Sequence, residues 1–438
     1  MCRAWSDFRA ASRRWLAVVC VVVPGVAALG LLATPGTTRA QGPQPATLDT
    51  TIEAGEPDYE KPNRKLVKWN EYDGPISTFR LGWGFLLDFA TYDQNQESKQ
   101  QIKMSPDVGV RDFRLLFKGK FKTKRPLSWS IGAMYDGNDK DWHFRQTGFL
   151  VAVPELSGHF FIGRTKEGYS LIKIMVGYDG WTIERSTGLD AFVPILADGV
   201  KYMGYSPRTR LLWNVGWFGD ALSNRESFST YHDLVVGRLA WLPILSDQEG
   251  KVLHVAVMAR EGSPEDDLIK QRSRPEVFLA PYFVDTGQFP SDFARTTGFE
   301  AFYRTRNLLF GGEYNFQDIR SSQKGNPLFH AGEALVSWVI TGETRPYNTV
   351  GGYFRSISPK RTVFEGGRGA VDAGLRFSYI DLDDGSLQGG KFWRLTPTVN
   401  WYLADFLRVE GAYGYGVLDR FGQKGTTQFF QARIQTCY

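Results

Sequence analysis

The chain has 438 residues, with 52 Lys and Arg against 47 Asp and Glu, and aromatic residues make up 14% of it. The basic excess lies in the first 40 residues; without them, 47 basic residues face 46 acidic ones. A nearly neutral chain has no general attraction to nucleic acid, so we expect no nucleic-acid partner. Of the three cysteines only Cys437 lies beyond that segment. This excludes a disulfide within the processed chain and any cysteine-based zinc or redox motif.

Residues 1–40 are expected to be a cleaved signal peptide. Four arginines between positions 3 and 14 precede an apolar stretch over residues 15–33, and small residues lead to an expected cut after Ala40. Residues 41–76 are polar and rich in proline, without a sustained period, and are expected to form a flexible periplasmic segment. We expect the remainder, 77–438, to be a single domain.

From residue 78 onward, apolar and polar side chains alternate. Between 112 and 121 the Phe and Leu residues at odd positions share one face, whereas Arg114, Lys118 and Lys120 share the other. Such a charged face cannot lie in a dry core. Sixteen segments of this kind can be counted. They are 78–89, 112–121, 127–135, 146–153, 159–166, 199–205, 211–218, 231–241, 252–260, 297–303, 308–316, 332–340, 370–380, 392–402, 407–417 and 428–438.

The last of these segments, 428–438, indicates that the strands cross a membrane. Phe430 and Ile434 share one face, Arg433 shares the other with glutamines, and the chain stops at the aromatic Tyr438. After an export signal, a terminal strand with an apolar outer face, a polar inner face and a final aromatic residue is typical of outer-membrane barrels. No later stretch approaches the roughly 20 apolar residues of a membrane helix, whereas barrel strands need only about 9 to 11 residues. The sequence therefore predicts an all-β protein, a transmembrane antiparallel β-barrel of about 16 strands in the outer membrane with a water-filled lumen.

The connections differ in length. Short turns, such as 123–126 and 404–405, are expected to alternate with the long connections 166–198, 262–295 and 343–368, as short periplasmic turns and long external or infolded loops do in such barrels. Residues 166–185 mix apolar anchors with cations, which favours a loop folded into the lumen that narrows the pore.

Cations recur on the inward parity of the strands. They are Arg114, Lys118, Lys120, Arg238, Arg376, Arg408 and Arg433. On the lipid face each would cost about 2 to 4 kcal/mol, so they must face the lumen, where Arg and Lys select anions. Acids such as Asp112 and Glu313 share this parity, which leaves open a simpler reading in which charges of both signs only keep the pore wet.

No catalytic motif is found. The five histidines are scattered, and the sequence has no HExxH pair, GxSxG elbow or Walker loop, so we expect no enzyme, metal site or cofactor. An outer-membrane barrel hydrolase remains a distant alternative, in which His254 would meet Ser206 or Ser337. A soluble, β-rich binding protein is another.

An ordered set of motifs resembles the phosphate-selective porin family. The set comprises Arg111-Asp112-Phe113-Arg114-Leu115, Gly163-Arg164-Thr165-Lys166, Glu184-Arg185-Ser186, Trp217-Phe218-Gly219-Asp220, Arg238-Leu239-Ala240-Trp241, Val284-Asp285-Thr286-Gly287, Thr341-Gly342-Glu343-Thr344-Arg345-Pro346-Tyr347, Asn400-Trp401-Tyr402-Leu403 and Gln431-Ala432-Arg433-Ile434-Gln435. The resemblance implies a homotrimer of sixteen-stranded barrels in outer-membrane lipid, in which phosphate or pyrophosphate passes along arginines to a constriction.

The resemblance also implies roles for single residues. Lys173 resembles the constriction lysine, Arg185 an arginine of the same loop, and Arg111 the first of two paired arginines. Lys166 lies in the motif that opens this loop. Two departures weaken tight phosphate binding: Asp112 replaces the second arginine, and Val176-Gly177 replaces a pair of serines.

We therefore expect an outer-membrane porin for passive diffusion of small anions, with phosphate or polyphosphate as the implied substrates. The expected anion-contacting residues are Lys173, Arg185, Arg114, Lys118, Lys120, Arg111 and Lys166. The nearest alternative is a weakly selective general porin, which the near-zero charge and Asp112 favour.

Overall fold

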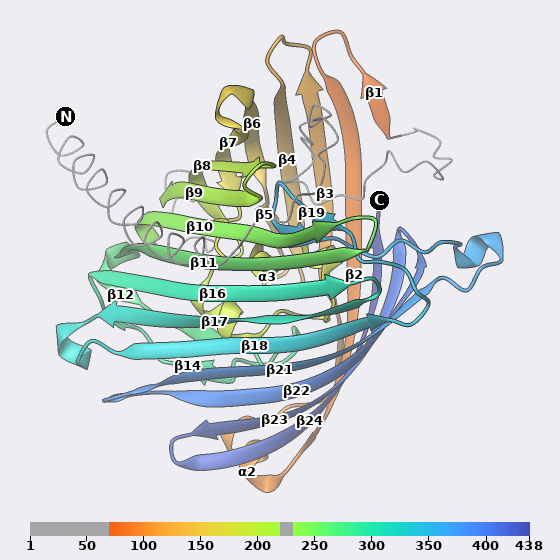
Figure 1. Cartoon of the computed structure of the whole chain (residues 1–438). Coiled ribbons are helices and arrows are strands. Elements are labelled where there is room, and N and C mark those ends of the chain that lie inside the picture. Colours follow the sequence, from red (N-terminus) through yellow and green to blue (C-terminus); the bar gives the residue numbers. More distant parts are fainter. Residues whose placement is uncertain (1–69, 220–230) are drawn as a thin grey trace, which may run out of the picture.

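The computed structural model describes residues 70–219 and 231–438, which form a large antiparallel sheet that closes on itself (Figure 1). The sheet has 18 strands; β1 (Glu71–Asp73) and β5 (Asp141–Phe144) are short additions, and the other 16 form the barrel. Pairing of the last strand, β24, with β2 closes the ring. All sixteen segments predicted from the alternating pattern are confirmed as barrel strands. The expected signal peptide and residues 41–69 lie outside the described residues.

The barrel strands are β2 (Thr78–Gln94), β3 (Asp107–Phe121), β4 (Leu127–Asp136), β6 (Thr147–Val153), β7 (Gly158–Thr165), β8 (Ala197–Ser206), β9 (Leu211–Gly219), β10 (Tyr231–Ser246), β11 (Lys251–Pro264), β16 (Phe293–Thr305), β17 (Leu308–Arg320), β18 (Leu328–Val339), β21 (Ala370–Asp384), β22 (Leu387–Ala404), β23 (Leu407–Arg420) and β24 (Gln423–Cys437). The smaller elements are the helices α2 (Gln96–Gln101), α3 (Leu171–Ile174) and α4 (Thr187–Phe192), the two-residue strands β12 (Leu268–Ile269), β13 (Arg272–Ser273), β14 (Val284–Asp285), β15 (Phe289–Pro290), β19 (Tyr347–Asn348) and β20 (Tyr353–Phe354), and the 3-10 turns η2 (Pro154–Leu156), η3 (Gly177–Asp179), η4 (Glu265–Asp267), η5 (Ser322–Lys324) and η6 (Val363–Glu365).

The short strand β1 lies within the segment 41–76 that was expected to be flexible. It pairs with the start of β2, with Tyr72 opposite Phe79, so strand pairing begins earlier than the proline-rich composition indicated.

Side chains alternate between lipid and lumen along the strands. On β24, Phe430 and Ile434 are 45% and 41% exposed, whereas Arg433 and Gln435 are 3% exposed and face inward. Aromatic contact pairs on the outer face include Tyr303–Phe310, beside the turn between β16 and β17, and Tyr314–Phe316, nearer the other end of β17. Such girdles mark the two interfaces of a membrane. No helix in the described part of the chain is long and apolar enough to cross a membrane.

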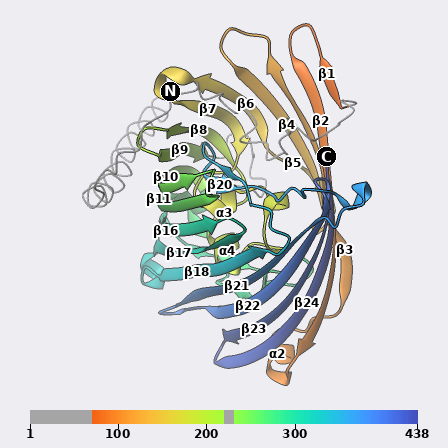
Figure 2. The ribbon, with the colours of Figure 1, turned by 45° about the vertical axis from the view of Figure 1, so that its right-hand side comes forward.

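Three segments fold into the barrel. We call them the first inner loop (166–196), the second inner loop (265–292) and the inner strap (340–369). Figure 2 shows α3 and α4 of the first inner loop and β20 of the strap between the walls. Trp181, Phe283 and Phe354, one from each segment, belong to the same apolar cluster as the wall residue Phe302. Three segments therefore narrow the lumen, where the sequence analysis expected one infolded loop to do so.

The strap corrects the expected placement of the long connections. Residues 343–368 were expected among the loops opposite the short turns, but the strap follows β18, which ends at the barrel end that carries the short turns and the C-terminus. We call this the turn end and the opposite one the loop end. The strap crosses the lumen, because Val350 packs against Leu150, Phe161 and Met203 of β6, β7 and β8.

The strap also meets the first inner loop. The backbone N–H of Ser356 donates to Asp179 Oδ1 at 2.9 Å, and Arg345 Nη1 donates to the carbonyl of Asp179 at 3.2 Å. Two segments that enter from opposite ends of the barrel are thus joined near Asp179.

This contact predicts a crosslink. In a Cys437→Ser background, Asp179→Cys combined with Ser356→Cys should form a disulfide on mild oxidation, visible by peptide mapping. Asp139→Cys with Ser356→Cys should form none, because Asp139 follows β4 at the loop end. Equal crosslinking of both pairs would contradict the strap's position.

Candidate functional site

Five inward-facing arginines of the wall are paired with carboxylates. Arg433 on β24 donates to both oxygens of Asp88, at 2.6 and 2.7 Å, and its remaining Nη1 donates to the carbonyl of Ile183 in the first inner loop. Four other wall arginines likewise bind a carboxylate and an inner-segment carbonyl: Arg238 (Glu300, Gly352), Arg260 (Glu167, Phe192), Arg376 (Glu276, Glu184) and Arg408 (Glu410, Gly180). Arg238, Arg376, Arg408 and Arg433 thus face inward as predicted, but they hold the loops instead of forming a column of free cations.

Carboxylates on the adjoining strands β16, β17 and β18 hold the same loop. Ser170 Oγ donates to Glu313 Oε2 at 2.6 Å, and Ser186 Oγ donates to Glu333 Oε1 at 2.8 Å. Glu300 accepts the backbone N–H of Leu171 at 2.8 Å. The first inner loop is therefore fixed between acids on β16–β18 and arginines on β21–β24.

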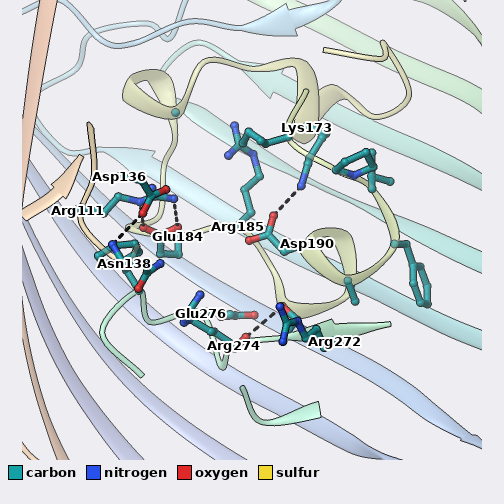
Figure 3. Close-up of a pocket in the computed structure, with 18 of the residues that line it drawn as sticks. Arg111, Asp136, Asn138, Lys173, Glu184, Arg185, Asp190, Arg272, Arg274 and Glu276 are labelled. Carbon is teal, nitrogen blue, oxygen red and sulfur yellow. Dashed lines mark hydrogen bonds and ion pairs between the residues drawn. The ribbon is translucent and has the colours of Figure 1, made fainter. Parts of the chain in front are cut away.

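A cavity of about 820 Å³ lies between the two inner loops and the wall of β3 and β4 (Figure 3). Nine basic and seven acidic residues line it. The basic residues are Arg111, Arg114, Arg145, Lys173, Arg185, Lys270, Arg272, Arg274 and Arg433. Four of the seven expected site residues, Arg111, Arg114, Lys173 and Arg185, are thereby brought together.

Arg111 reaches this cavity because of a β-bulge. The register between β2 and β3 shifts by one residue at Arg111, so Arg111 and Asp112 both turn inward, although strict alternation from Arg114 would place Arg111 in lipid. Asp112 is fully buried and accepts Arg114 Nη2 at 2.5 Å and Arg111 Nη1 at 3.3 Å. Glu184 of the first inner loop also binds Arg111, at 3.0 Å. Part of the charge of both arginines is thus compensated.

Lys173 and Arg185 lie side by side in the first inner loop. Lys173 Nζ is 2.8 Å from Asp190 Oδ1, and burial lowers the pKa of Lys173 while the Asp190 carboxylate opposes this. Arg185 donates to the backbone carbonyls of Ile172 and Met175, at 3.1 and 2.8 Å. Among the described residues no carboxylate forms an ion pair with Arg185. The constriction lysine implied by the resemblance is thus paired, and the arginine beside it is not.

The second inner loop adds cations that the sequence analysis missed. Lys270, Arg272 and Arg274 line the cavity, and both guanidinium groups stack on the ring of Tyr282, at 4.1 and 4.5 Å. The sequence could have indicated them through their spacing of two residues, because this spacing puts all three side chains on one face of an extended segment. Tyr282 fixes the arginines without neutralising them.

Five lining cations have no carboxylate within ion-pairing distance in residues 70–219 and 231–438. They are Arg145, Arg185, Lys270, Arg272 and Arg274. By contrast, Glu184, Asp190 and Glu276 of the lining are each bound by a cation. The lining also includes the acids Asp136, Asp139, Glu265 and Asp266, so its formal charge, nine basic against seven acidic residues, is positive by two.

A second cavity, of about 90 Å³, continues toward the turn end. It shares Arg114, Arg145, Val176 and Gly177 with the large cavity and reaches Tyr438 at the C-terminus. A Cβ atom on Gly177 would lie 3.6 Å from Arg114 Nη2. The two cavities thus adjoin where two arginines face the Val176-Gly177 backbone.

The other expected residues lie outside the large cavity. Lys166 lines the small one, and its Nζ donates to the carbonyls of Ile174 and Met175, at 3.0 and 2.7 Å. Burial lowers the pKa of Lys166 well below its ordinary value. Lys118 and Lys120 lie near the turn end of β3 and line neither cavity.

The hydrolase alternative gains no support from the described residues. His254 is buried, and its ring nitrogens contact the Tyr347 hydroxyl at 2.6 Å and Glu300 at 2.8 Å. Ser337 donates to Asp372 at 2.6 Å, and neither it nor Ser206 is paired with His254.

Comparison with known proteins agrees with this architecture. A sequence model described as phosphate-selective porin O and P matches residues 79–435. The chain belongs to this family. It is accordingly an outer-membrane porin, as expected, and its family is one of channels, which favours a channel over an enzyme.

Solved structures show the same fold. The chain resembles the outer-membrane channel DcaP of Acinetobacter baumannii with a TM-score of 0.53 and 10% identity, covering 84% of this chain and 99% of that one. For OmpT of Vibrio cholerae in its trimer form the TM-score is 0.51 and the identity 12%, and the match covers 83% of this chain and 100% of that one. For an anion-selective porin of Comamonas acidovorans the TM-score is 0.50 and the identity 11%, and the match covers 83% of this chain and 100% of that one. An uncharacterized protein of Caulobacter vibrioides is 28% identical over 190 residues, which are 42% of this chain and 37% of that protein.

The wall pairs predict a stability effect. Arg433→Gln leaves Asp88 without its cation, and breaking a buried pair costs about 3 to 5 kcal/mol, so thermal unfolding of the refolded barrel should shift to clearly lower temperature. Arg320→Gln, an exposed outward arginine, should change stability by less than about 0.5 kcal/mol. Adding Asp88→Asn to Arg433→Gln should recover part of the loss; without any recovery the pairing would not be the cause.

The junction of the two cavities predicts a conductance effect. Gly177→Leu should lower single-channel conductance in planar bilayers severalfold, because its side chain would fill the space before Arg114. Val176→Ala should raise conductance. Unchanged conductance in Gly177→Leu would mean that ions pass elsewhere.

Proposed function

We propose that this porin passes small anions by passive diffusion, with phosphate and polyphosphate as the substrates that its family implies. The observation that carries the proposal is the set of five uncompensated cations in the large cavity. An entering anion exchanges part of its hydration shell for guanidinium and ammonium donors, which bind oxyanions through charge-assisted hydrogen bonds. Inside a narrow lumen these contacts are stronger than in open water.

The elements that carry the cations suggest their order along the path. Lys270, Arg272 and Arg274 come from the second inner loop, and Lys173 and Arg185 from the first, whereas Arg114 and Arg145 border the small cavity that continues toward the turn end. Short turns of such barrels face the periplasm. An anion would thus pass from the loop cations to Arg114 and Arg145, and then toward the periplasm.

Carboxylates beside these cations keep the binding of the anion weak at each position along the path. Asp190 competes with the anion for Lys173, and Asp112 competes for Arg111 and Arg114. Val176 and Gly177 supply no hydroxyl donors at the junction of the cavities. Conduction requires that no site holds its ion too firmly. We therefore infer an anion-preferring channel with weak phosphate sites. Its affinity for phosphate would be lower than that of a tight phosphate channel, and its anion preference would be stronger than that of a general porin.

We also propose a homotrimer. The family resemblance and the trimer form of the Vibrio OmpT structure support it. Strands β6 and β7 have only 7 and 8 residues, fewer than the roughly 9 to 11 that a lipid-facing strand needs. Another copy of the chain would cover this low part of the wall. A single-copy mass in native mass spectrometry would contradict the trimer.

Ion selectivity tests the proposal. Under a KCl gradient the reversal potential should indicate anion preference, and Arg272→Gln combined with Arg274→Gln should move it toward zero. Arg320→Gln is the control, because this arginine faces outward. A cation-preferring or unselective wild type would reject the anion pathway.

Phosphate block tests the substrate. Phosphate titrated into chloride should reduce chloride current, and the block should weaken in Lys173→Glu. Absence of any block, with anion preference intact, would leave a general anion porin. Ester or phospholipid hydrolysis by the pure protein, abolished in His254→Ala, would instead favour the hydrolase.

A further inference from the structure

The inner strap leaves the lumen before it joins β21 and forms a projection on the outside of the barrel. We call residues 359–369 the outer tab; it contains η6. It belongs to the light-blue turn that projects from the barrel at the right of Figure 1. Neither the anion pathway nor the strap contacts described above use these residues.

The tab has a defined local conformation. Glu365 accepts the backbone N–H of Thr362 at 3.0 Å and its hydroxyl at 2.9 Å, which forms a capping box around η6. Gly366 follows with a φ of 74°, a left-handed value that glycine adopts without strain. Arg361 Nε donates to the carbonyl of Glu365 at 2.8 Å.

The tab lies against outward-facing aromatic residues at the turn end. Trp401, a lipid-side residue of β22 that is 41% exposed, donates its indole N–H to the carbonyl of Arg368 at 2.9 Å. Phe364 stacks on Phe406, with ring centroids 5.8 Å apart and planes at 10°, and remains 65% exposed. Aromatic residues in this position form the girdle at the membrane interface.

The charge of the tab is positive. Lys360, Arg361 and Arg368 are exposed, and none forms an ion pair with a carboxylate of the described chain. The acid of the tab is Glu365, which is occupied by the capping box. The nearby Asp405 accepts the hydroxyl of Ser358. An exposed ring beside uncompensated guanidinium groups matches the boundary between acyl chains and phosphate groups.

We propose that the outer tab binds anionic phospholipid headgroups of the periplasmic leaflet, with Arg361 and Arg368 on the lipid phosphate and Phe364 in the acyl-chain boundary. The turn end places the tab at this leaflet, because short turns face the periplasm. Basic residues near an anionic membrane surface attract it at short range. The inference rests on the outer-membrane location and not on the proposed anion selectivity.

Native mass spectrometry of the detergent-purified protein, titrated with phosphatidylglycerol or phosphatidylethanolamine, tests this site. Wild type should retain phosphatidylglycerol in preference, and Arg361→Gln with Arg368→Gln should lower its affinity roughly tenfold or more. The matched control is Lys122→Gln with Arg125→Gln. These residues lie at the same end of the barrel, but are already paired with Asp73 and Glu155, both at 2.8 Å. The control should retain the lipid.

Two outcomes would overturn the site. Equal phosphatidylglycerol affinity in the tab variant and wild type is the first. Loss of the oligomer in the tab variant with lipid affinity unchanged is the second, since it would make the tab a contact between copies. If the double arginine variant fails to fold, Phe364→Ser replaces it, with reduced lipid retention and unaltered single-channel conductance as the expected result.

Discussion

The position of every inner segment depends on ion pairs in the barrel wall. A buried guanidinium is costly unless a carboxylate compensates it, and one carboxylate does not use all five of its N–H donors. In Arg433 the unused donor binds the carbonyl of Ile183, and in Arg238 it binds that of Gly352. The pairs thus keep charge inside the wall at low net cost and also fix the loops. A lumen of bare arginines could not do this, because repulsion between like charges would remain.

This division of roles indicates which charges would carry the proposed anion selectivity. The arginines described above on the barrel strands are bound to carboxylates and loop carbonyls. The unpaired positive charge that a passing ion would meet therefore comes from the inner loops and from interruptions in the strand pairing of the wall. Arg185, Arg272 and Arg274 lie on loops, and Arg145 lies between β5 and β6, where the wall is interrupted. The near-neutral composition of the processed chain is therefore compatible with the proposed anion pathway.

Much of the fold could be predicted from the sequence, because the period of two is a direct record of lipid on one side and polar surroundings on the other. All sixteen strands follow from it, as does the inward position of Arg114. The inward position of Arg111 could be predicted only from the family resemblance. A one-residue bulge turns this side chain inward against the alternation, and a bulge depends on the register between two strands, which one sequence segment does not reveal. The strap was placed at the wrong end from its length alone; the order of the strands would have placed it, because β18 is the twelfth strand and even-numbered strands run toward the C-terminal end. Lys270, Arg272 and Arg274 stayed hidden because infolding depends on tertiary contacts such as those of Glu276 with Arg376.

The two adjoining cavities of the lumen are unequal in size. One side holds about 820 Å³ with most of the loop cations, and the other about 90 Å³ beside Arg114 and Arg145. When fixed charge lines a tapering passage, counter-ions accumulate in it under one polarity of the applied voltage and are depleted under the other. The current through this protein should therefore rectify, and the direction of rectification would report which mouth faces each electrode.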